Sequence, residues 1–140
     1  MGDKSNIEIA QFTAECFNTR EFRATIPYLS DDLEWTEVPN GRVFRGPEGA
    51  IEEYEAWAVA FPDGKVEVKN IVAQGDNVVV EMVVTGTNTG PMLGPDGGML
   101  EPTGKKTVLG LCDVMDFKDG KVVGGRSYFD LDTIKRQLGQ

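Results

Sequence analysis

The chain has 140 residues, of which 40% are hydrophobic and 26% are charged, and its formal net charge at pH 7 is -9. This size and composition are typical of one globular domain with its own core, so we expect residues 1–140 to fold as a single domain. The acidic balance disfavours nucleic acids and anionic membranes as partners. The polar start and the lack of a long apolar run predict a cytoplasmic location.

The first half of the chain predicts three helices. Apolar residues at helical spacing indicate the first over Asn6–Asn18, and Thr19 can cap a second, shorter helix that contains Pro27. Pro47 suits the first turn of a third helix, which ends at Pro62–Gly64. The inward stripe of that helix is predicted to be Ile51, Tyr54, Ala58 and Phe61.

Strands are predicted between the helices and after them. Leu33–Val38 reads as a strand, with a short candidate partner around Val43 and Phe44. Val66–Ala73 and Asn77–Thr87 predict a hairpin. In the first strand of that hairpin, one face is expected to carry Val66, Val68, Asn70 and Val72.

The last third of the chain predicts a long loop, a second hairpin and a closing helix. Thr89–Lys105 is rich in Gly and Pro, and loops of this length often serve as lids or binding loops. Thr107–Phe117 and Lys121–Phe129 predict the hairpin, and Asp130 caps a helix over Leu131–Leu138. A three-residue turn between the strands would keep odd positions on one face, which places inward Val123, Gly125, Ser127 and Phe129.

Asp113 is the most informative residue of these strands. Side chains alternate between the faces of a strand, so Asp113 lies in an apolar row with Leu111 and Met115. A carboxylate there is costly unless it is paired, hydrogen-bonded or protonated, and desolvated carboxyls collect at functional sites. The alternative is a structural role, in which a buried Asp caps a loop or pairs with an Arg.

Glu37 repeats the pattern on the strand Leu33–Val38, where it shares a face with Leu33 and Trp35. A Glu on an edge strand is often only solvated, so the functional and the solvated interpretations both stay open. The chain has no histidine, which removes Ser-His and Cys-His nucleophile systems and the usual zinc sites. Acid–base chemistry would therefore fall to carboxylates, Tyr, Lys or Cys, and we expect neither a metal nor a cofactor.

Together these elements predict an α+β fold, in which a curved, mostly antiparallel sheet packs on three N-terminal helices, with a short C-terminal helix. The inward rows would line an apolar pocket that carries two carboxyls and a hydroxyl, the usual make-up of a small-molecule site. For most of its apolar members, plain core is the simpler interpretation. The expected lining is Trp35, Glu37, Met82, Val84, Leu111, Asp113, Met115, Ser127 and Phe129.

Several short stretches resemble the SnoaL-like polyketide cyclases of the nuclear-transport-factor-2-like superfamily. They are Gly86–Gly90, Pro102–Lys105, Lys118–Lys121, Arg126–Asp130 and Arg136–Gly139. The Arg-x-Tyr-Phe-Asp tail is also similar to that of limonene epoxide hydrolase. The resemblance covers nearly the whole chain and implies a cone-shaped barrel with a deep apolar cavity, commonly dimeric through the outer face of the sheet. We therefore expect a homodimer.

The catalytic residues that the resemblance implies are altered here. Cyclases of this family place an acid–base Asp on the last strand, where this chain has Ser127, and a His on the preceding strand, where it has Asp113. Epoxide hydrolases use that same last-strand Asp, and also an Arg and an Asp that match Met82 and Val84; their Tyr and Asn match Trp35 and Glu37. The epoxide-hydrolase triad is therefore absent, whereas Asp113 keeps an ionisable group.

The favoured hypothesis is a cofactor-free enzyme that binds a hydrophobic, carbonyl-bearing small molecule. Asp113, helped by Glu37, would remove a proton next to the carbonyl, and Ser127 would orient the substrate or Asp113. Aldol cyclisation, isomerisation or elimination would follow. Two alternatives remain: a dimeric module that binds a hydrophobic ligand without catalysis, and an epoxide hydrolase with relocated acid–base residues.

Overall fold

The computed structural model of the protein describes residues 4–94 and 96–139. Its helices are α1 (Asn6–Thr19), the 3-10 helix η1 (Phe22–Tyr28), α2 (Gly46–Ala60) and α3 (Leu131–Gln137). Its strands are β1 (Leu29–Glu37), β2 (Arg42–Arg45), β3 (Lys65–Gln74), β4 (Asn77–Thr87), β5 (Met92–Leu93), β6 (Met99–Leu100), β7 (Lys106–Lys118) and β8 (Lys121–Phe129).

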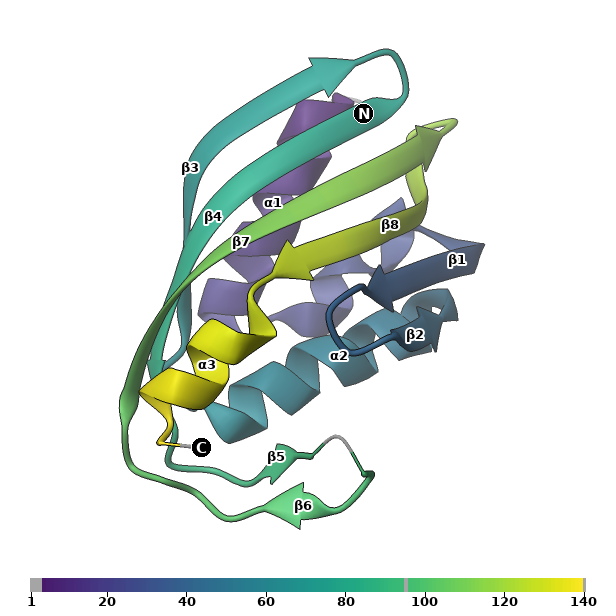
Figure 1. The fold of residues 1–140 in the computed structure, drawn as a ribbon. Helices are drawn as coiled ribbons and strands as arrows, with labels where there is room; N and C mark the ends of the chain where they lie inside the picture. Colours follow the sequence, from purple (N-terminus) through teal and green to yellow (C-terminus); the bar gives the residue numbers. More distant parts are fainter. Residues whose placement is uncertain (1–3, 95, 140) are drawn as a thin grey trace.

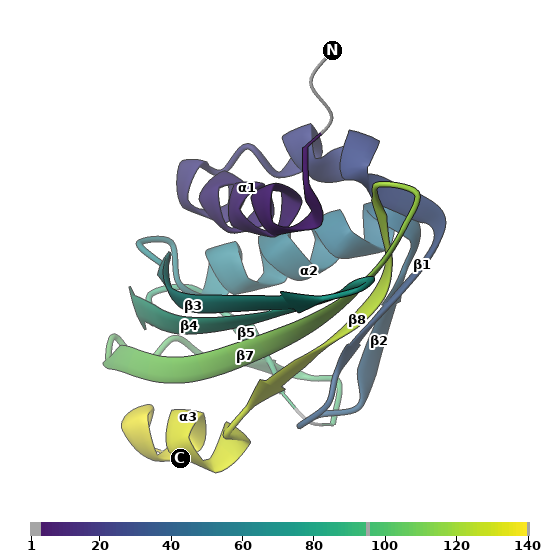
Figure 2. The ribbon, with the colours of Figure 1, turned by 90° about the horizontal axis from the view of Figure 1, so that it is seen from above.

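Six strands form one curved sheet in the order β2-β1-β8-β7-β4-β3, and β5 pairs with β6 in a separate small hairpin (Figure 1). All neighbours in the large sheet are antiparallel except β1 and β8, which run parallel. Seen from above, the sheet curves around α1 and α2 (Figure 2). The predicted α+β class, with a curved and mostly antiparallel sheet, is confirmed.

The N-terminal helices form where the sequence predicts them. Ser5 and Glu8 make a reciprocal capping box at the start of α1, with Glu8 N donating to Ser5 Oγ over 3.1 Å. The second predicted helix is a short 3-10 helix and not an α-helix, because Pro27 lies inside it. The chain then enters β1 at Leu29, earlier than the predicted Leu33.

Two β-bulges, one in β3 and one in β8, change which residues of these strands face inward from those that the sequence predicts. In β3, Lys69 is an extra residue between the pairs Val68–Met82 and Asn70–Glu81, so Ile71 rather than Val72 turns inward, and Val72 is 55% exposed. In β8, Val123 is the extra residue, and Val122 lies in the core with 1% exposure. The predictions for Asn70, Val72 and Val123 were therefore wrong, because one inserted residue reverses the alternation.

The bulge in β8 also sets the register at the centre of the sheet. The turn between β7 and β8 has two residues, Asp119 and Gly120, both with positive φ (52° and 78°), and not the three that were predicted. Lys118 therefore pairs with Lys121 at the turn. Beyond the bulge the register shifts by one, so that Asp113 lies directly opposite Ser127 instead of diagonal to it.

The predicted long loop over residues 89–105 is held at its base by Asn88, which is 1% exposed. The Asn88 Nδ2 donates to the carbonyls of Ala60 and Gly90, each over 3.0 Å. Its Oδ1 accepts from the backbone N and the hydroxyl of Thr103, each over 3.0 Å. The segment between these contacts carries β5 and β6 and lies beside α2 (Figure 1).

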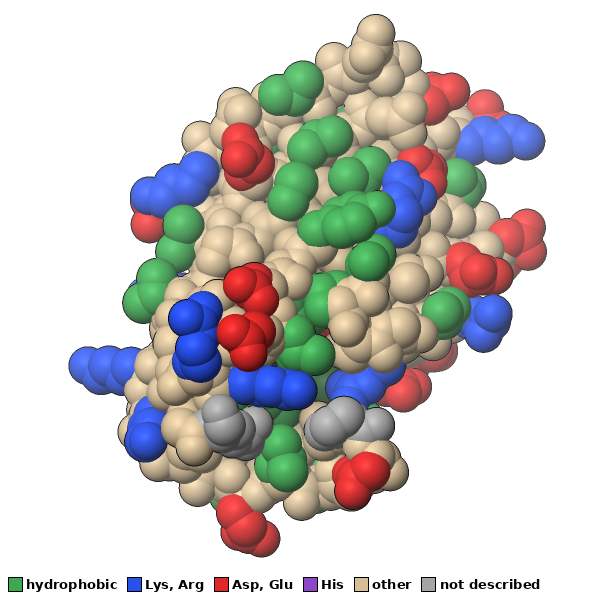
Figure 3. Space-filling model, in the orientation of Figure 1, with side chains coloured by type: hydrophobic (Ala, Val, Ile, Leu, Met, Phe, Trp, Pro, Cys, Tyr) green, Lys and Arg blue, Asp and Glu red, His purple; other side chains and the backbone are tan. Residues whose placement is uncertain are grey.

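Among the described residues, no helix covers most of the convex face of the large sheet (Figure 1). Apolar side chains gather over its strands in Figure 3, and the exposed ones include Val72, Val108 and Tyr128. The N-terminal part of β7 extends past the end of β8, and α3 lies along it. There the Gln137 side chain accepts from Val108 N over 2.8 Å and donates to Val108 O over 2.9 Å, which blocks this free strand edge. None of the helices in the described ranges has the length and apolar character that a bilayer crossing requires.

Gly125 leaves the space in which the Trp35 ring lies. A Cβ at Gly125 would overlap the Trp35 ring and lie 2.8 Å from the carbonyl oxygen of Val114. We predict that Gly125→Ala lowers the free energy of unfolding by about 1–3 kcal/mol, as overpacking does. Urea unfolding would measure this. Gly110→Ala on the neighbouring strand is the control, since a Cβ there meets nothing within 4 Å, and equal stability of the two variants would contradict the prediction.

Candidate functional site

A cavity of about 120 Å³ lies between α1, α2 and the concave face of the sheet. Its wall is mostly apolar, which limits access of water to any charged group inside it. The apolar lining includes Phe17, Leu33, Trp35, Val80, Met82, Val84, Leu109, Leu111 and Met115. Its polar groups include Asp113, Ser127, Glu53 and Tyr54.

A short chain of hydrogen bonds crosses three strands at one end of this cavity. Trp35 Nε1 on β1 donates to Ser127 Oγ on β8 over 2.9 Å. The Ser127 hydroxyl then donates to Asp113 Oδ1 on β7 over 2.7 Å. The direct pairing of positions 113 and 127 places these side chains on the same face of adjacent strands. Ser127 is thus fixed between a donor and an acceptor, and it orients the Asp113 carboxyl.

The Asp113 carboxyl titrates far above an ordinary aspartate. Burial raises its pKa from the ordinary value of 3.8 to about 7. The hydrogen bond from Ser127 opposes this rise, and the charge of Glu37 adds to it. A carboxyl with a pKa near neutrality can both accept and return a proton, which suits general acid–base chemistry.

Glu53 adds a second carboxyl to the cavity from α2. Burial raises its pKa well above the ordinary range, and the neighbouring carboxylates of Glu37 and Asp113 raise it further. The Glu37 carboxylate can accept a hydrogen bond from the protonated form of Glu53. Glu53 therefore favours the protonated state, in which it is a hydrogen-bond donor. Burial also raises the pKa of the nearby Tyr54 hydroxyl, which keeps that group neutral.

Glu37 is buried behind the cavity wall, with 2% exposure. Its Oε1 accepts from Asn40 Nδ2 over 2.9 Å, and its Oε2 accepts from Trp57 Nε1 over 2.9 Å. Glu37 and Phe129 line a second pocket of about 100 Å³ and do not line the first one. Trp57 borders both pockets and separates them.

The structure therefore brings together most of the side chains that the sequence singled out. Seven of them line the first cavity: Trp35, Met82, Val84, Leu111, Asp113, Met115 and Ser127. Glu37 lies next to Glu53, and its charge contributes to the raised pKa of Asp113, although Glu37 lines the second pocket. Asp130 lies at the surface as the N-cap of α3.

Sequence reasoning missed Glu53 and Trp57, although the signal was present. Residues 50, 53, 54 and 57 follow the i, i+3, i+4, i+7 spacing of one helical face, so Glu53 lies in the inward stripe of α2. A charged residue in that stripe is the same kind of signal as Asp113 on β7. Within residues 4–94 and 96–139, no group of three His, Cys, Asp or Glu side chains is arranged to hold a metal ion.

A profile of SnoaL-like polyketide cyclases matches residues 7–138 of the chain. The chain belongs to the SnoaL-like polyketide cyclase family. No curated protein sequence matches it. The SnoaL-like protein of Jannaschia sp. CCS1, provisionally assigned as a polyketide cyclase, superposes with a TM-score of 0.83 at 22% identity, over 99% of this chain and 97% of that one.

Two Streptomyces structures are also similar to this SnoaL-like chain. IdmH of Streptomyces antibioticus, provisionally assigned as a polyketide cyclase, has a TM-score of 0.79 at 23% identity, over 98% of this chain and 100% of its own. AclR of Streptomyces galilaeus, provisionally assigned as a hydroxylase, has a TM-score of 0.76 at 26% identity, over 94% and 92%. At these identities the structures share a fold, while their assignments differ in reaction.

The raised pKa of Asp113 predicts a specific pH dependence of stability. Unfolded aspartates ionise near pH 4, whereas folded Asp113 keeps its proton to about pH 7. The folded state therefore binds more protons between these values, and this contribution to stability is lost as the pH rises from about 4 to 7. We predict that Asp113→Asn removes that loss and raises the free energy of unfolding at pH 8, by at most about 4 kcal/mol.

Urea unfolding of wild type and variant at pH 5 and pH 8 would measure the effect. Asp119→Asn, in the exposed β7–β8 turn, is the matched control and should leave the pH dependence unchanged. If Asp113→Asn is less stable than wild type at pH 8, the carboxylate is a structural partner and the assignment of a raised pKa is wrong.

Proposed function

We propose that the protein is a cofactor-free acid–base enzyme that removes a proton next to the carbonyl of a hydrophobic small molecule. The observation that carries the proposal is that two carboxyls, Asp113 and Glu53, with raised pKa values line one apolar cavity. Membership of the SnoaL-like polyketide cyclase family supports an enzyme of this kind. Burial in such a cavity tunes carboxyls towards the neutral pH at which general acids and bases act best.

The two carboxyls take different roles. Asp113, with a pKa of about 7, is ionised in a large fraction of molecules near neutral pH and accepts the carbon-bound proton. The electron pair of the broken C–H bond moves into the substrate, which becomes an enolate. Protonated Glu53 turns its single O–H from Glu37 to the enolate oxygen and donates a hydrogen bond to it. Asp113 then returns its proton, either to another carbon, which is isomerisation, or to the alkoxide formed when the enolate attacks a second carbonyl, which is aldol closure.

Ser127 acts as a positioning residue in this scheme. It accepts a hydrogen bond from the Trp35 N–H and donates one to Asp113, which holds the Oδ1 atom of the carboxyl in place. The proposed substrate contacts are the apolar lining residues Trp35, Met82, Val84, Leu111 and Met115. Phe129 packs edge-on against Trp57, with 5.7 Å between the ring centroids, and so supports a residue of the cavity wall.

A second candidate function is binding without catalysis, which is favoured by Ser127 at the position where the resemblance implies an acid–base Asp. The buried carboxyls count against it, since a purely apolar ligand gains nothing from them. For an epoxide hydrolase, the apolar Met82 and Val84 leave no Arg–Asp pair in the lining. The homodimer expected from the resemblance stays a prediction, and the uncovered apolar face of the sheet is the surface on which a second copy would pack.

Hydrogen–deuterium exchange would test the proton abstraction directly. We predict that the protein accelerates deuterium uptake at the α-carbon of 1-tetralone in D₂O, measured by NMR. Asp113→Asn should lose most of this acceleration, which for a general base is about a hundred- to ten-thousand-fold. Glu53→Gln should lose less, because its amide still donates a hydrogen bond.

Glu52→Gln is the matched control for these variants, because Glu52 is the exposed neighbour on the same helix. If wild-type protein binds 1-tetralone and related ketones but exchanges no proton at any pH, the proposal of an enzyme is wrong and the protein is a binding module. If Asp113→Asn exchanges as fast as wild type, the base lies elsewhere.

Ser127→Ala separates positioning from a merely structural role. Loss of the hydroxyl removes a hydrogen bond that lowers the pKa of Asp113, so we predict that the acidic limb of the exchange–pH profile moves to higher pH. Ser30→Ala, on β1 outside the cavity lining, is the control and should not move it. A uniform loss of rate with an unmoved profile would contradict the assigned link between Ser127 and Asp113.

A further inference from the structure

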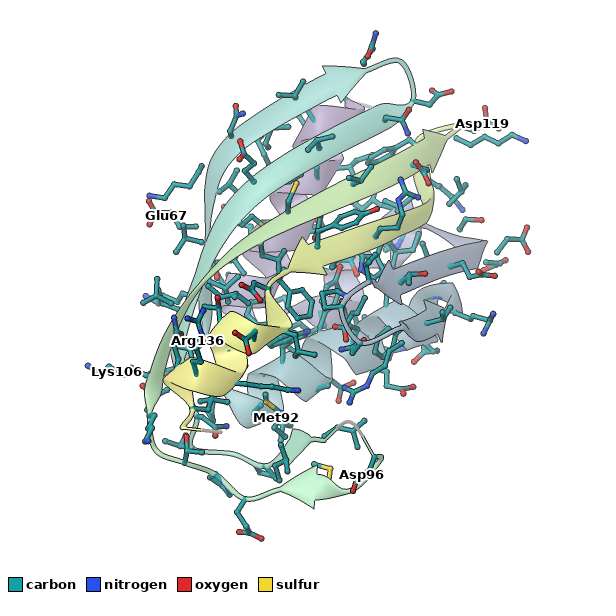
Figure 4. The ribbon with its side chains drawn as sticks, viewed as in Figure 1. Glu67, Met92, Asp96, Lys106, Asp119 and Arg136 are labelled. Atoms are coloured by element: carbon teal, nitrogen blue, oxygen red, sulfur yellow. The ribbon has the colours of Figure 1, made fainter. Side chains whose placement is uncertain are left out.

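The second pocket, of about 100 Å³, is enclosed by α2, α3, β2 and the β5–β6 hairpin. Its wall is mostly apolar, with side chains such as Met92, Leu100, Phe129 and Ile134. Figure 4 shows Met92 on β5, beneath α2. This pocket plays no part in the proton transfer proposed above, because Asp113 and Glu53 line the first cavity and not this one.

Two cations, Arg42 of β2 and Lys135 of α3, also line the second pocket, and both are half-buried. Neither side chain is in an ion pair with any residue in the described ranges. The Arg42 Nη2 donates to the carbonyls of Leu93 and Gly94, each over 3.2 Å, and both of these partners are neutral. Two cations without an ion-pair partner in the described chain therefore border this pocket.

Glu37 is the acidic residue in the lining of this pocket, and it lies opposite Arg42 in the β1–β2 pair. Its carboxylate oxygens accept hydrogen bonds from Asn40 and Trp57, and within the described chain it forms no ion pair with Arg42 or Lys135. The positive groups are therefore available to a ligand. No hydrogen bond in the described chain uses Nε or Nη1 of Arg42, so these groups can donate to a carboxylate, and the ammonium of Lys135 adds a strong single contact.

We propose that the second pocket binds a small amphipathic carboxylate, with its apolar body against Met92, Leu100 and Phe129 and its anionic end on Arg42 and Lys135. The two pockets differ in charge, so they favour different ligands. Asp113 and Glu53 line the first cavity, where ionised Asp113 repels an anion. An uncharged ketone suits the first cavity, and a carboxylate suits the second.

Calorimetric titration of 4-phenylbutyrate and of its uncharged amide, 4-phenylbutanamide, at pH 7.5 and low salt would test the proposal. The carboxylate should bind about tenfold more tightly than the amide, because each charge-assisted hydrogen bond is worth about a tenfold change or more. Lys135→Gln should remove most of this preference and leave the affinity for the amide unchanged. Lys121→Gln, an exposed lysine at the β7–β8 turn, is the matched control.

Arg42→Gln should act in the same direction, although it also removes the contacts of Arg42 with the β5–β6 hairpin. Within the described chain Lys135 makes no hydrogen bond to that hairpin, so Lys135→Gln is the more direct test. Asp113→Asn tests whether the carboxylate binds in the first cavity instead. If it did, removal of the Asp113 charge would tighten its binding. The proposal predicts no change in affinity. Equal affinity for carboxylate and amide, or tighter binding by Asp113→Asn, would overturn the proposal without affecting the proposed catalysis.

Discussion

A carboxyl group in an apolar cavity must be hydrogen-bonded or protonated. The adjacent strands β1, β8 and β7 place hydrogen-bonding side chains next to Asp113 and so meet that requirement. Trp35 supplies the first donor and Ser127 passes the hydrogen bond on to the carboxyl. This works only because Gly125 leaves room for the indole ring and because the bulge at Val123 aligns positions 113 and 127. A local irregularity of the sheet thus sets the geometry of the site.

The three carboxyls of this region are held in different ways, and the difference gives each a different chemical character. Glu37 accepts hydrogen bonds from two N–H donors, those of Asn40 and Trp57. Asp113 receives one hydroxyl and faces the cavity, and Glu53 lies between the charges of the other two. Like charges at close range cannot all ionise, so the site retains protons at neutral pH without any histidine. Trp57 is central to this arrangement, since one side chain both anchors Glu37 and divides the two pockets.

The element order and the inward position of Asp113 and Ser127 could be predicted from the sequence, because alternation and helical spacing are local properties. Val72 and Val123 could not be assigned correctly, since a bulge depends on how two strands pair and leaves no mark in a single strand. The separation of Glu37 and Phe129 from the first cavity also needed the structure, because it depends on where Trp57 of α2 packs. Glu53 differs: its place in the stripe of Ala50, Tyr54 and Trp57 was readable, and it was missed because the helix was read only for its apolar residues.

The parallel pairing of β1 with β8 has a consequence for how the chain folds. The hydrogen bond from Trp35 to Ser127 joins residues 92 positions apart, and every β1–β8 contact closes a loop of similar length. Loop closure over such a distance is entropically costly, and contacts of this kind slow folding. On the ribosome, β1 is complete long before β8 has been synthesised, so the hydrogen bond from Trp35 that holds Ser127 is among the last to form. The site is therefore absent from any nascent chain that still lacks its final strand.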